Sequence, residues 1–243
     1  MTESDGTDEV AWWDQWNTQD GPNFCHDSPR THTGHLAVRE VEQLKLDNPS
    51  ILEVGCGNGW LAEKLSGIGQ YVGLDLAPAA VEAAKKRVPS ADFVVADFHT
   101  WQAQDGSFDI VVMVDTIAYF RDQDKAVARA RSLLKPGGWL VLTTVNPFVY
   151  SRLSWVGPPG QGQVRKWLTR KAVEDLLERN GFERQKLYTV LPAGDRGILR
   201  LLNSRKLSKL LFGGEVSRWY TRLKEKVGLG QFRVAVAHKR AVI

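Results

Sequence analysis

The chain has 243 residues, of which 43% are hydrophobic and 25% are charged, and its formal net charge is +4. This composition suits one sizeable core, or one core with an added cap, and it excludes a wholly disordered chain. No apolar run approaches the roughly 20 residues that cross a bilayer, so we do not expect an integral membrane protein.

The cysteines and the first residues bear on metal binding and on the cellular compartment of the protein. The two cysteines, Cys25 and Cys56, are too few for a zinc site of four thiolates, and we expect no metal. The first ten residues carry acids but neither a basic n-region nor an apolar h-region, which argues against a secretory signal. We therefore expect a reduced cysteine pair and a cytoplasmic protein.

Charge is distributed unevenly along the chain. Residues 1–29 hold seven acids and no Lys or Arg, whereas residues 151–243 hold twenty bases and seven acids, a net of +13. A basic third is compatible with nucleic acid, an anionic membrane or an acidic partner, and also with simple solvated helix faces. Because the aromatic and glycine signature of RNA-binding sheets is missing, solvated faces are the preferred interpretation and nucleic acid is not favoured.

Short β-rich runs alternate with helical patterns over the first two thirds of the chain. The predicted strands are 51–55, 71–75, 93–96, 108–114 and 139–145. The predicted helices start at 61 and cover 79–88 and 122–134, the last one ended by Lys135-Pro136-Gly137-Gly138. The run FDIVVMV at 108–114 is almost wholly apolar, as in a parallel strand buried on both faces. This alternation predicts a parallel sheet with right-handed crossovers.

The pattern changes after Asn146-Pro147. We expect a loop or cap over 148–167, a helix over 169–179, strands at 183–191 and 232–237, and a basic insertion at about 195–230. The fold class is therefore α/β: a doubly wound, seven-stranded, mostly parallel Rossmann-like sheet, with an N-terminal helical cap and an α-helical insert before the last strand. Its expected parts are a cap segment 1–34, a core 35–147, and 148–243 as the C-terminal part of the same domain.

A glycine-rich turn follows the first strand, in the sequence Ile51-Leu52-Glu53-Val54-Gly55-Cys56-Gly57-Asn58-Gly59-Trp60. Ligands bind at this edge of open α/β sheets, and the glycines permit positive φ and close approach of the backbone. A dinucleotide fold needs its third glycine where Trp60 stands, so the spacing disfavours a nicotinamide oxidoreductase.

The pattern Glu-x-Gly-x-Gly-x-Gly resembles motif I of the class I S-adenosylmethionine-dependent methyltransferases. Asp75 lies 22 residues after Glu53 and Asp97 another 22 residues on, each at the end of a predicted strand. The stretches Phe108-Asp109-Ile110-Val111-Val112 and 133–140 (LLKPGGWL) also resemble family motifs. The similarity covers residues 51–145, and within the family it is greatest to small-molecule members of the ubiquinone-biosynthesis-like, methyltransferase type 11 group.

The resemblance implies S-adenosyl-L-methionine as cofactor, S-adenosyl-L-homocysteine as product, and a set of cofactor contacts. Glu53, Gly55, Gly57 and Gly59, with Cys56 as a small loop residue, would shape the methionine end. Asp75 and Leu76 would hold the ribose, and Asp97 and Phe98 the adenine. The Val114 carbonyl would meet the ammonium group, and Arg39 resembles a basic residue that some small-molecule members use for the methionine carboxylate.

Candidates for the transfer step follow the fourth and fifth strands or lie near the N-terminus. Asp115 and Tyr119 follow the fourth strand and Asn146 the fifth, so we expect all three at the pocket mouth. His26 and His32 are the preferred histidines if a general base is used. The sequence at 143–147 is not an Asn-Pro-Pro-Tyr motif, which weakens a nucleic-acid amine as substrate.

The predicted cap and insert bear on the substrate. Trp12, Trp13 and Trp16 either dock a helix on the core or line an apolar pocket, and apolar residues at 216–227 repeat at helical spacing in the basic insert. We expect a lid over an apolar or aromatic small molecule that is methylated on oxygen or nitrogen. A lipid or quinone methyltransferase at a membrane surface, or a cofactor-binding partner subunit without transfer activity, remain alternatives. The oligomeric state stays open.

Overall fold

The computed structural model describes residues 6–17, 29–153, 163–191, 219 and 222–240. Its helices are α1 (Gly6–Gln15), α2 (Pro29–Gln43), α3 (Ala62–Ser66), α4 (Pro78–Arg87), α5 (Gln123–Leu133), α6 (Pro147–Leu153) and α7 (Arg170–Arg179). Its strands are β1 (Ser50–Val54), β2 (Gln70–Asp75), β3 (Asp92–Val95), β4 (Phe108–Val114), β5 (Leu134–Val145), β6 (Phe182–Val190) and β7 (Phe232–Lys239). A short 3-10 turn, η2 (Ile117–Tyr119), follows β4.

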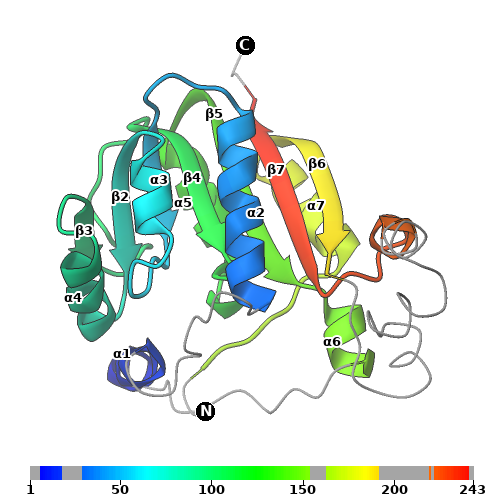
Figure 1. Cartoon of the computed structure of the whole chain (residues 1–243), viewed down its shortest axis with the longest axis horizontal. Helices are drawn as coiled ribbons and strands as arrows, with labels where there is room; N and C mark the ends of the chain where they lie inside the picture. The colour runs from blue at the N-terminus through cyan, green and yellow to red at the C-terminus, as the bar shows by residue number, and fades with distance from the viewer. Residues whose placement is uncertain (1–5, 18–28, 154–162, 192–218, 220–221, 241–243) are drawn as a thin grey trace.

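The strands form one seven-stranded sheet in the order β3-β2-β1-β4-β5-β7-β6 (Figure 1). Neighbours from β3 to β5 pair in parallel, whereas β7 pairs antiparallel with both β5 and β6. The chain order reverses between β1 and β4, which creates the switch point where ligands bind in open α/β sheets. The predicted fold class is thus confirmed, with β7 as the antiparallel strand.

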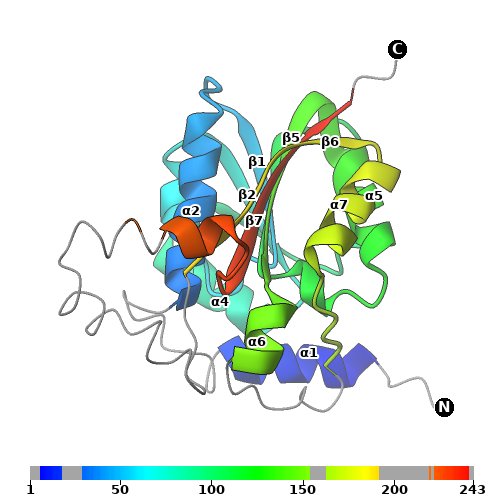
Figure 2. The same ribbon diagram turned by 90° about the vertical axis from the view of Figure 1, so that its right-hand side faces the viewer.

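Helices cover both faces of the sheet (Figure 2). On one face, α2 and α3 contribute Ala37, Val41 and Leu65 to a buried cluster with β1 and β4. On the other face, α5 and α7 pack Val127 and Leu176 against the same strands and β5. This two-sided burial explains why β4 is apolar along almost its whole length.

Local sequence signals set the helix ends. Pro78 occupies the first turn of α4, where its missing N–H costs no hydrogen bond. The side chains of Asp122 and Thr169 cap α5 and α7 by accepting hydrogen bonds from the backbone N–H groups of Lys125 and Ala172. These caps place both helices close to the bounds that the sequence predicts.

Two segments differ from the prediction. The stretch Lys135-Pro136-Gly137-Gly138 was expected as a turn, but β5 already begins at Leu134, which pairs with Phe108 before the register shifts. The region 148–167, expected as a loop or cap, contains part of α6. Most of the basic insertion at 195–230 and His26 lie outside the described residues, and the division of the chain into parts stays a prediction.

The edge formed by the carboxyl ends of β1, β2, β3 and β4 positions the site. Helix α1 lies across this edge in both views (Figures 1 and 2). None of the helices in the described part of the chain is both long and apolar enough to cross a membrane.

Candidate functional site

A cavity of about 400 Å³ lies at this sheet edge, beneath α1. Its walls come from the ends of β1 to β4, the η2 turn and α1. Among the residues that line it are Gly55, Gly57, Asp75, Leu76, Asp97, Phe98, His99, Val114, Asp115, Tyr119 and Phe120, and from α1 and the residues after it Glu9, Trp13, Trp16 and Asn17. The structure therefore brings together nine predicted cofactor and catalytic positions, which follow four separate strands.

The glycine turn after β1 forms the floor of the cavity. Gly55 and Gly57 have φ values of 78° and 52°, a region that residues with a side chain rarely adopt. A Cβ atom on Gly55 would lie 2.5 Å from Thr116 Oγ1, so the turn also has no room for one. The glycines thus expose backbone to the cavity and leave space for a ligand.

Asp75, at the end of β2, is tied to this turn. Its Oδ2 accepts a hydrogen bond from the Gly57 N–H at 2.7 Å, and its Oδ1 accepts one from the Ala77 N–H at 3.0 Å. Burial raises the pKa of the carboxyl, the backbone hydrogen bonds counteract this, and the nearby Asp14 carboxylate adds to the rise. Each carboxylate oxygen keeps a lone pair for a further donor, as the two hydroxyls of a ribose would require.

The end of β3 forms the next wall. Asp97 Oδ1 accepts the His99 N–H at 2.7 Å, and the buried Phe98 ring meets Phe120 edge-on at 5.9 Å between centroids. His99 Nδ1 is buried and has no hydrogen-bond partner in the described part of the chain. Aromatic rings and an unsatisfied polar atom in one cavity wall suit a heteroaromatic base that brings its own donors.

Asp115, directly after β4, has a positive φ of 55°. Its N–H donates to Thr143 Oγ1 at 2.9 Å, while the same hydroxyl donates to Asp115 Oδ1 at 3.0 Å. The Thr33 hydroxyl of α2 donates to Asp115 Oδ2 at 3.4 Å. Both threonines are fully buried, so the surroundings hold this carboxylate in a strained backbone conformation.

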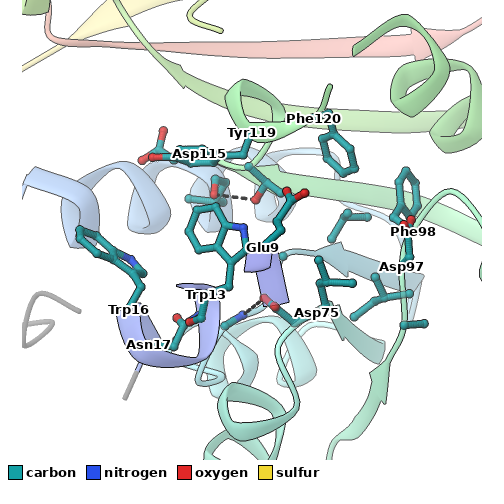
Figure 3. A pocket seen from close by; sticks show the side chains of 18 of the residues that line it. Glu9, Trp13, Trp16, Asn17, Asp75, Asp97, Phe98, Asp115, Tyr119 and Phe120 are labelled. Atoms are coloured by element: carbon teal, nitrogen blue, oxygen red, sulfur yellow. Dashed lines mark hydrogen bonds between the residues drawn. The ribbon is translucent and has the colours of Figure 1, made fainter. Parts of the chain in front are cut away.

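Helix α1 covers the cavity through several contacts (Figure 3). Asp14 Oδ1 accepts the Ala79 N–H at 2.8 Å, at the first turn of α4. The carboxylate of Glu9 lies 3.5 Å from the Arg121 guanidinium, and the Trp13 ring meets Tyr119 edge-on at 4.7 Å. Trp13 therefore serves both expected purposes, since it docks the helix and also lines the pocket.

Trp12, in contrast, does not line the cavity. Its ring stacks on Trp16, with centroids 5.3 Å apart, and so supports Trp16 from outside. This arrangement agrees with the predicted placement of the two residues on one helix face.

Several predicted site residues lie outside the cavity lining. Arg39 is exposed on α2 and interacts with Tyr188 of β6, so it does not reach the cavity. His32 is also exposed on α2. Cys56 is buried beneath the turn, and a Cβ atom on Gly59 would lie 2.8 Å from Ala84, so both residues pack the turn against the core.

Asn146 is not at the pocket mouth as expected. It is fully buried, its amide donates to the Gly228 and Gly230 carbonyls at 2.9 and 2.7 Å, and its Oδ1 accepts from Arg233 at 2.6 Å. All its polar atoms are thus used to join the end of β5 to the segment before β7.

Glu53 is buried behind the turn rather than in the cavity. Its Oε2 accepts a hydrogen bond from the Tyr71 hydroxyl at 2.6 Å, and only 1% of the residue is exposed. Burial raises the pKa of this carboxyl to about 8, the Tyr71 hydrogen bond lowers it, and the Asp75 charge raises it again.

This shift gives a pH prediction. Between pH 4.5, the ordinary pKa of a glutamate, and about pH 8, folded Glu53 keeps a proton that the unfolded chain releases. The unfolded state then binds fewer protons, so this group lowers the free energy of unfolding as pH rises, by up to about 1.4 kcal/mol per pH unit. Glu53→Gln keeps the hydrogen-bond acceptor for Tyr71 but cannot titrate. We therefore expect its free energy of unfolding to fall less steeply with pH than that of the parent.

Urea unfolding of both proteins at several pH values between these limits measures the effect. Glu63→Gln, at an exposed position on α3, is the matched control and should retain the slope of the parent. An unchanged slope in Glu53→Gln would contradict the buried, protonated carboxyl.

Sequence reasoning missed the partners that complete the site. Thr33, Thr143 and Asn17 belong to no motif, and Thr33 lies 82 positions from the aspartate that it contacts. His99 and Glu9 also line the cavity without having been predicted. His99 alone had a signal, because it follows the adenine candidates Asp97 and Phe98 directly.

Comparison with known proteins identifies similar chains. Residues 30–187 match the family described as a methyltransferase domain. A phthiotriol/phenolphthiotriol dimycocerosates methyltransferase from Mycobacterium ulcerans is 27% identical over 230 residues, which cover 89% of this chain and 84% of that protein. A ubiquinone biosynthesis O-methyltransferase from Thiobacillus denitrificans is 32% identical over 142 residues, which cover 56% of this chain and 58% of that protein.

A solved structure agrees in fold. The S-adenosylmethionine-dependent methyltransferase structure from Thermotoga maritima superposes with a TM-score of 0.64 at 20% identity, covering 94% of this chain and 99% of that one. The family match extends over well over half of the chain and includes the glycine turn, Asp75, Asp97 and Asp115.

Proposed function

Because the chain belongs to the class I S-adenosylmethionine-dependent methyltransferases, we propose that it transfers the methyl group to an oxygen or nitrogen atom of an apolar or aromatic small molecule. The enzyme class and the cofactor follow from the family. The identity of the acceptor is the proposed part.

The cavity fits the cofactor. Gly55 and Gly57 line the cavity without side chains, and Asp75 offers carboxylate lone pairs. The buried His99 Nδ1, which has no hydrogen-bond partner among the described residues, follows Phe98 in the same wall. We assign the methionine end to the glycine turn and the Val114 carbonyl, and the ribose to Asp75 and Leu76. The adenine then lies at Asp97 and Phe98.

When bound, S-adenosylmethionine supplies a methyl group already activated on a sulfonium. The chain must therefore align the acceptor and exclude water. The observation that carries our proposal is the Asp115 carboxylate, held by Thr143 and Thr33 in a cavity that Trp13 and Tyr119 border. A carboxylate only accepts hydrogen bonds, so it selects an acceptor with an O–H or N–H and withdraws the proton as the new bond forms.

A lipid-soluble acceptor is the second candidate. The two relatives above are named for phthiotriol dimycocerosates and for ubiquinone biosynthesis. The aromatic walls suit a phenol, a quinol or the end of an apolar chain equally well.

Transfer of labelled methyl from S-adenosylmethionine tests the proposal. We would offer a soluble catechol, an arylalkylamine and a long-chain quinol in detergent, each with S-adenosylhomocysteine formation as a second readout. Methylation of one of them above the rate without acceptor is expected. Tight S-adenosylhomocysteine binding with no transfer to any acceptor class would instead indicate a cofactor-binding subunit.

A further inference from the structure

An exposed apolar row, formed by Trp219, Leu223 and Val227, lies just before β7. The three residues follow one another at intervals of four, which is the spacing of neighbours on one side of a helix. They are 63%, 39% and 62% exposed, whereas apolar side chains of this size usually contact the core. Figure 1 shows this segment beside the ends of β6 and β7.

The opposite side of the segment is fixed to the sheet. The Glu225 carbonyl accepts the Thr189 hydroxyl at 2.6 Å, and the Glu225 carboxylate accepts the Leu191 N–H at 3.2 Å. Lys224 is buried, and the Asn146 amide binds the Gly228 carbonyl. These contacts fix which side of the segment faces the sheet, and the apolar row is therefore left on the outer side.

The charges around the row are basic. Arg222 and Lys226 are exposed next to it, while the one acid of this turn, Glu225, is directed toward β6. The wider stretch 195–228 holds nine bases and three acids. An apolar row with exposed basic neighbours is typical of helices that lie in the interface of an anionic bilayer.

We propose that Trp219, Leu223 and Val227, with Arg222 and Lys226, dock the enzyme on the surface of an anionic lipid bilayer. The inference deepens the proposed function, because it gives a lipid-soluble acceptor a route to the enzyme. The segment leads into Phe232, which pairs with Val145 at the end of β5. Docking therefore takes place at the sheet edge that holds the cavity.

The size of the row favours a bilayer over a second protein chain. A stable protein interface buries about 800 Å² on each partner, far more than three side chains provide. A bilayer needs no such area. An inserted tryptophan side chain, together with two basic side chains that contact anionic headgroups, already contributes to binding.

Co-sedimentation of the full chain with vesicles tests the proposal. We expect binding to phosphatidylcholine vesicles that contain phosphatidylglycerol, at least about tenfold weaker binding to pure phosphatidylcholine, and a loss of binding as salt rises. Trp219→Ser/Leu223→Ser/Val227→Ser should weaken binding about tenfold or more, and Arg222→Gln/Lys226→Gln should reduce it mainly at low salt.

The matched control is Leu46→Ser/Val95→Ser, which removes two exposed apolar side chains elsewhere and should bind as the parent does. Failure of the parent to bind anionic vesicles at low salt overturns the proposal. Parent-like binding by the triple variant overturns it as well, as does a dimer in light scattering that the triple variant dissociates.

Calorimetry with S-adenosylhomocysteine separates this proposal from the proposed function. All variants should bind the compound with the affinity of the parent, which also shows that they are folded. Vesicle binding without any S-adenosylhomocysteine binding by the parent would leave the docking surface standing and remove the methyltransferase site.

Discussion

Asp75→Ala is expected to lose binding of S-adenosylhomocysteine by at least about 100-fold, measured by calorimetry. The variant removes the acceptor of the Gly57 and Ala77 N–H groups, which orders the glycine turn, and also the acceptor for the ribose hydroxyls. Hydrogen bonds to a charged group contribute about 1.5–3 kcal/mol each, so two lost ribose contacts alone account for this factor.

Two further variants sharpen this test. Asp75→Asn keeps one carbonyl oxygen for a backbone N–H, so it should bind with an affinity between those of the parent and the alanine variant. Asp92→Ala, at the exposed start of β3 and the far end of the sheet, should bind as the parent does. If a folded Asp75→Ala binds within tenfold of the parent, the ribose lies elsewhere.

Most of the sheet could be predicted because its signals are local. Strand β4 is a short apolar run, and β1 ends at a glycine turn, so chain order and burial both follow from pattern. The direction of β7 could not be predicted, because a run such as FRVAVA is compatible with parallel or antiparallel pairing. Its direction depends on the route of the preceding residues, which no local pattern encodes.

The turn before β5 shows where local signals mislead. Pro136 and Gly137 are strong breakers of regular structure. The backbone nevertheless pairs at Leu134 and again from Trp139 onward, with the register shift against β4 absorbing the irregular residues. Residues 135–138 themselves have no register partner in β4 or β7, so the breakers form an irregularity within the strand instead of ending it.

The cofactor half of the candidate site was predictable and the remainder was not. Residues at the ends of consecutive parallel strands must meet at one edge, which brings Asp75, Asp97 and Val114 to the same cavity. No comparable rule predicts which way a side chain on a helix is directed, and Arg39 of α2 interacts with Tyr188 of β6 instead of the cavity. Glu53 is the residue before the last one of β1, and its side chain faces Tyr71 because a strand directs alternate side chains to opposite faces.

The surroundings of Asp115 support the role that we propose for it in acting on the acceptor. Its main chain and side chain form a closed pair of hydrogen bonds with Thr143, and Thr33 donates to the second oxygen. A non-glycine residue with φ of 55° costs roughly 1–2 kcal/mol, which these contacts offset. The structure thus maintains a carboxylate at one position beside Val114, where the cofactor ammonium is expected.

Asp115→Asn is therefore expected to lower kcat for the acceptor found by the transfer screen by about 100-fold or more, because the amide cannot take a proton. S-adenosylhomocysteine affinity should stay within a few-fold of the parent. Asp122→Asn, at the exposed cap of α5, is the matched control and should retain kcat. A kcat near that of the parent in Asp115→Asn would show that the acceptor needs no base.

Thr143→Val and Thr33→Val test how the carboxylate is held. Each removes one hydroxyl donor without a change in volume, so we expect kcat to fall about tenfold with the KM for S-adenosylmethionine unchanged. Thr143→Ser restores the hydroxyl and should restore kcat, which a purely structural role for the Thr143 methyl group would not allow. A folded Thr143→Val that is as active as the parent, beside an inactive Asp115→Asn, would show that the carboxylate acts without the Thr143 hydroxyl. The strained backbone of Asp115 would then be held by the hydrogen bond from its N–H to the Thr143 carbonyl at 3.2 Å.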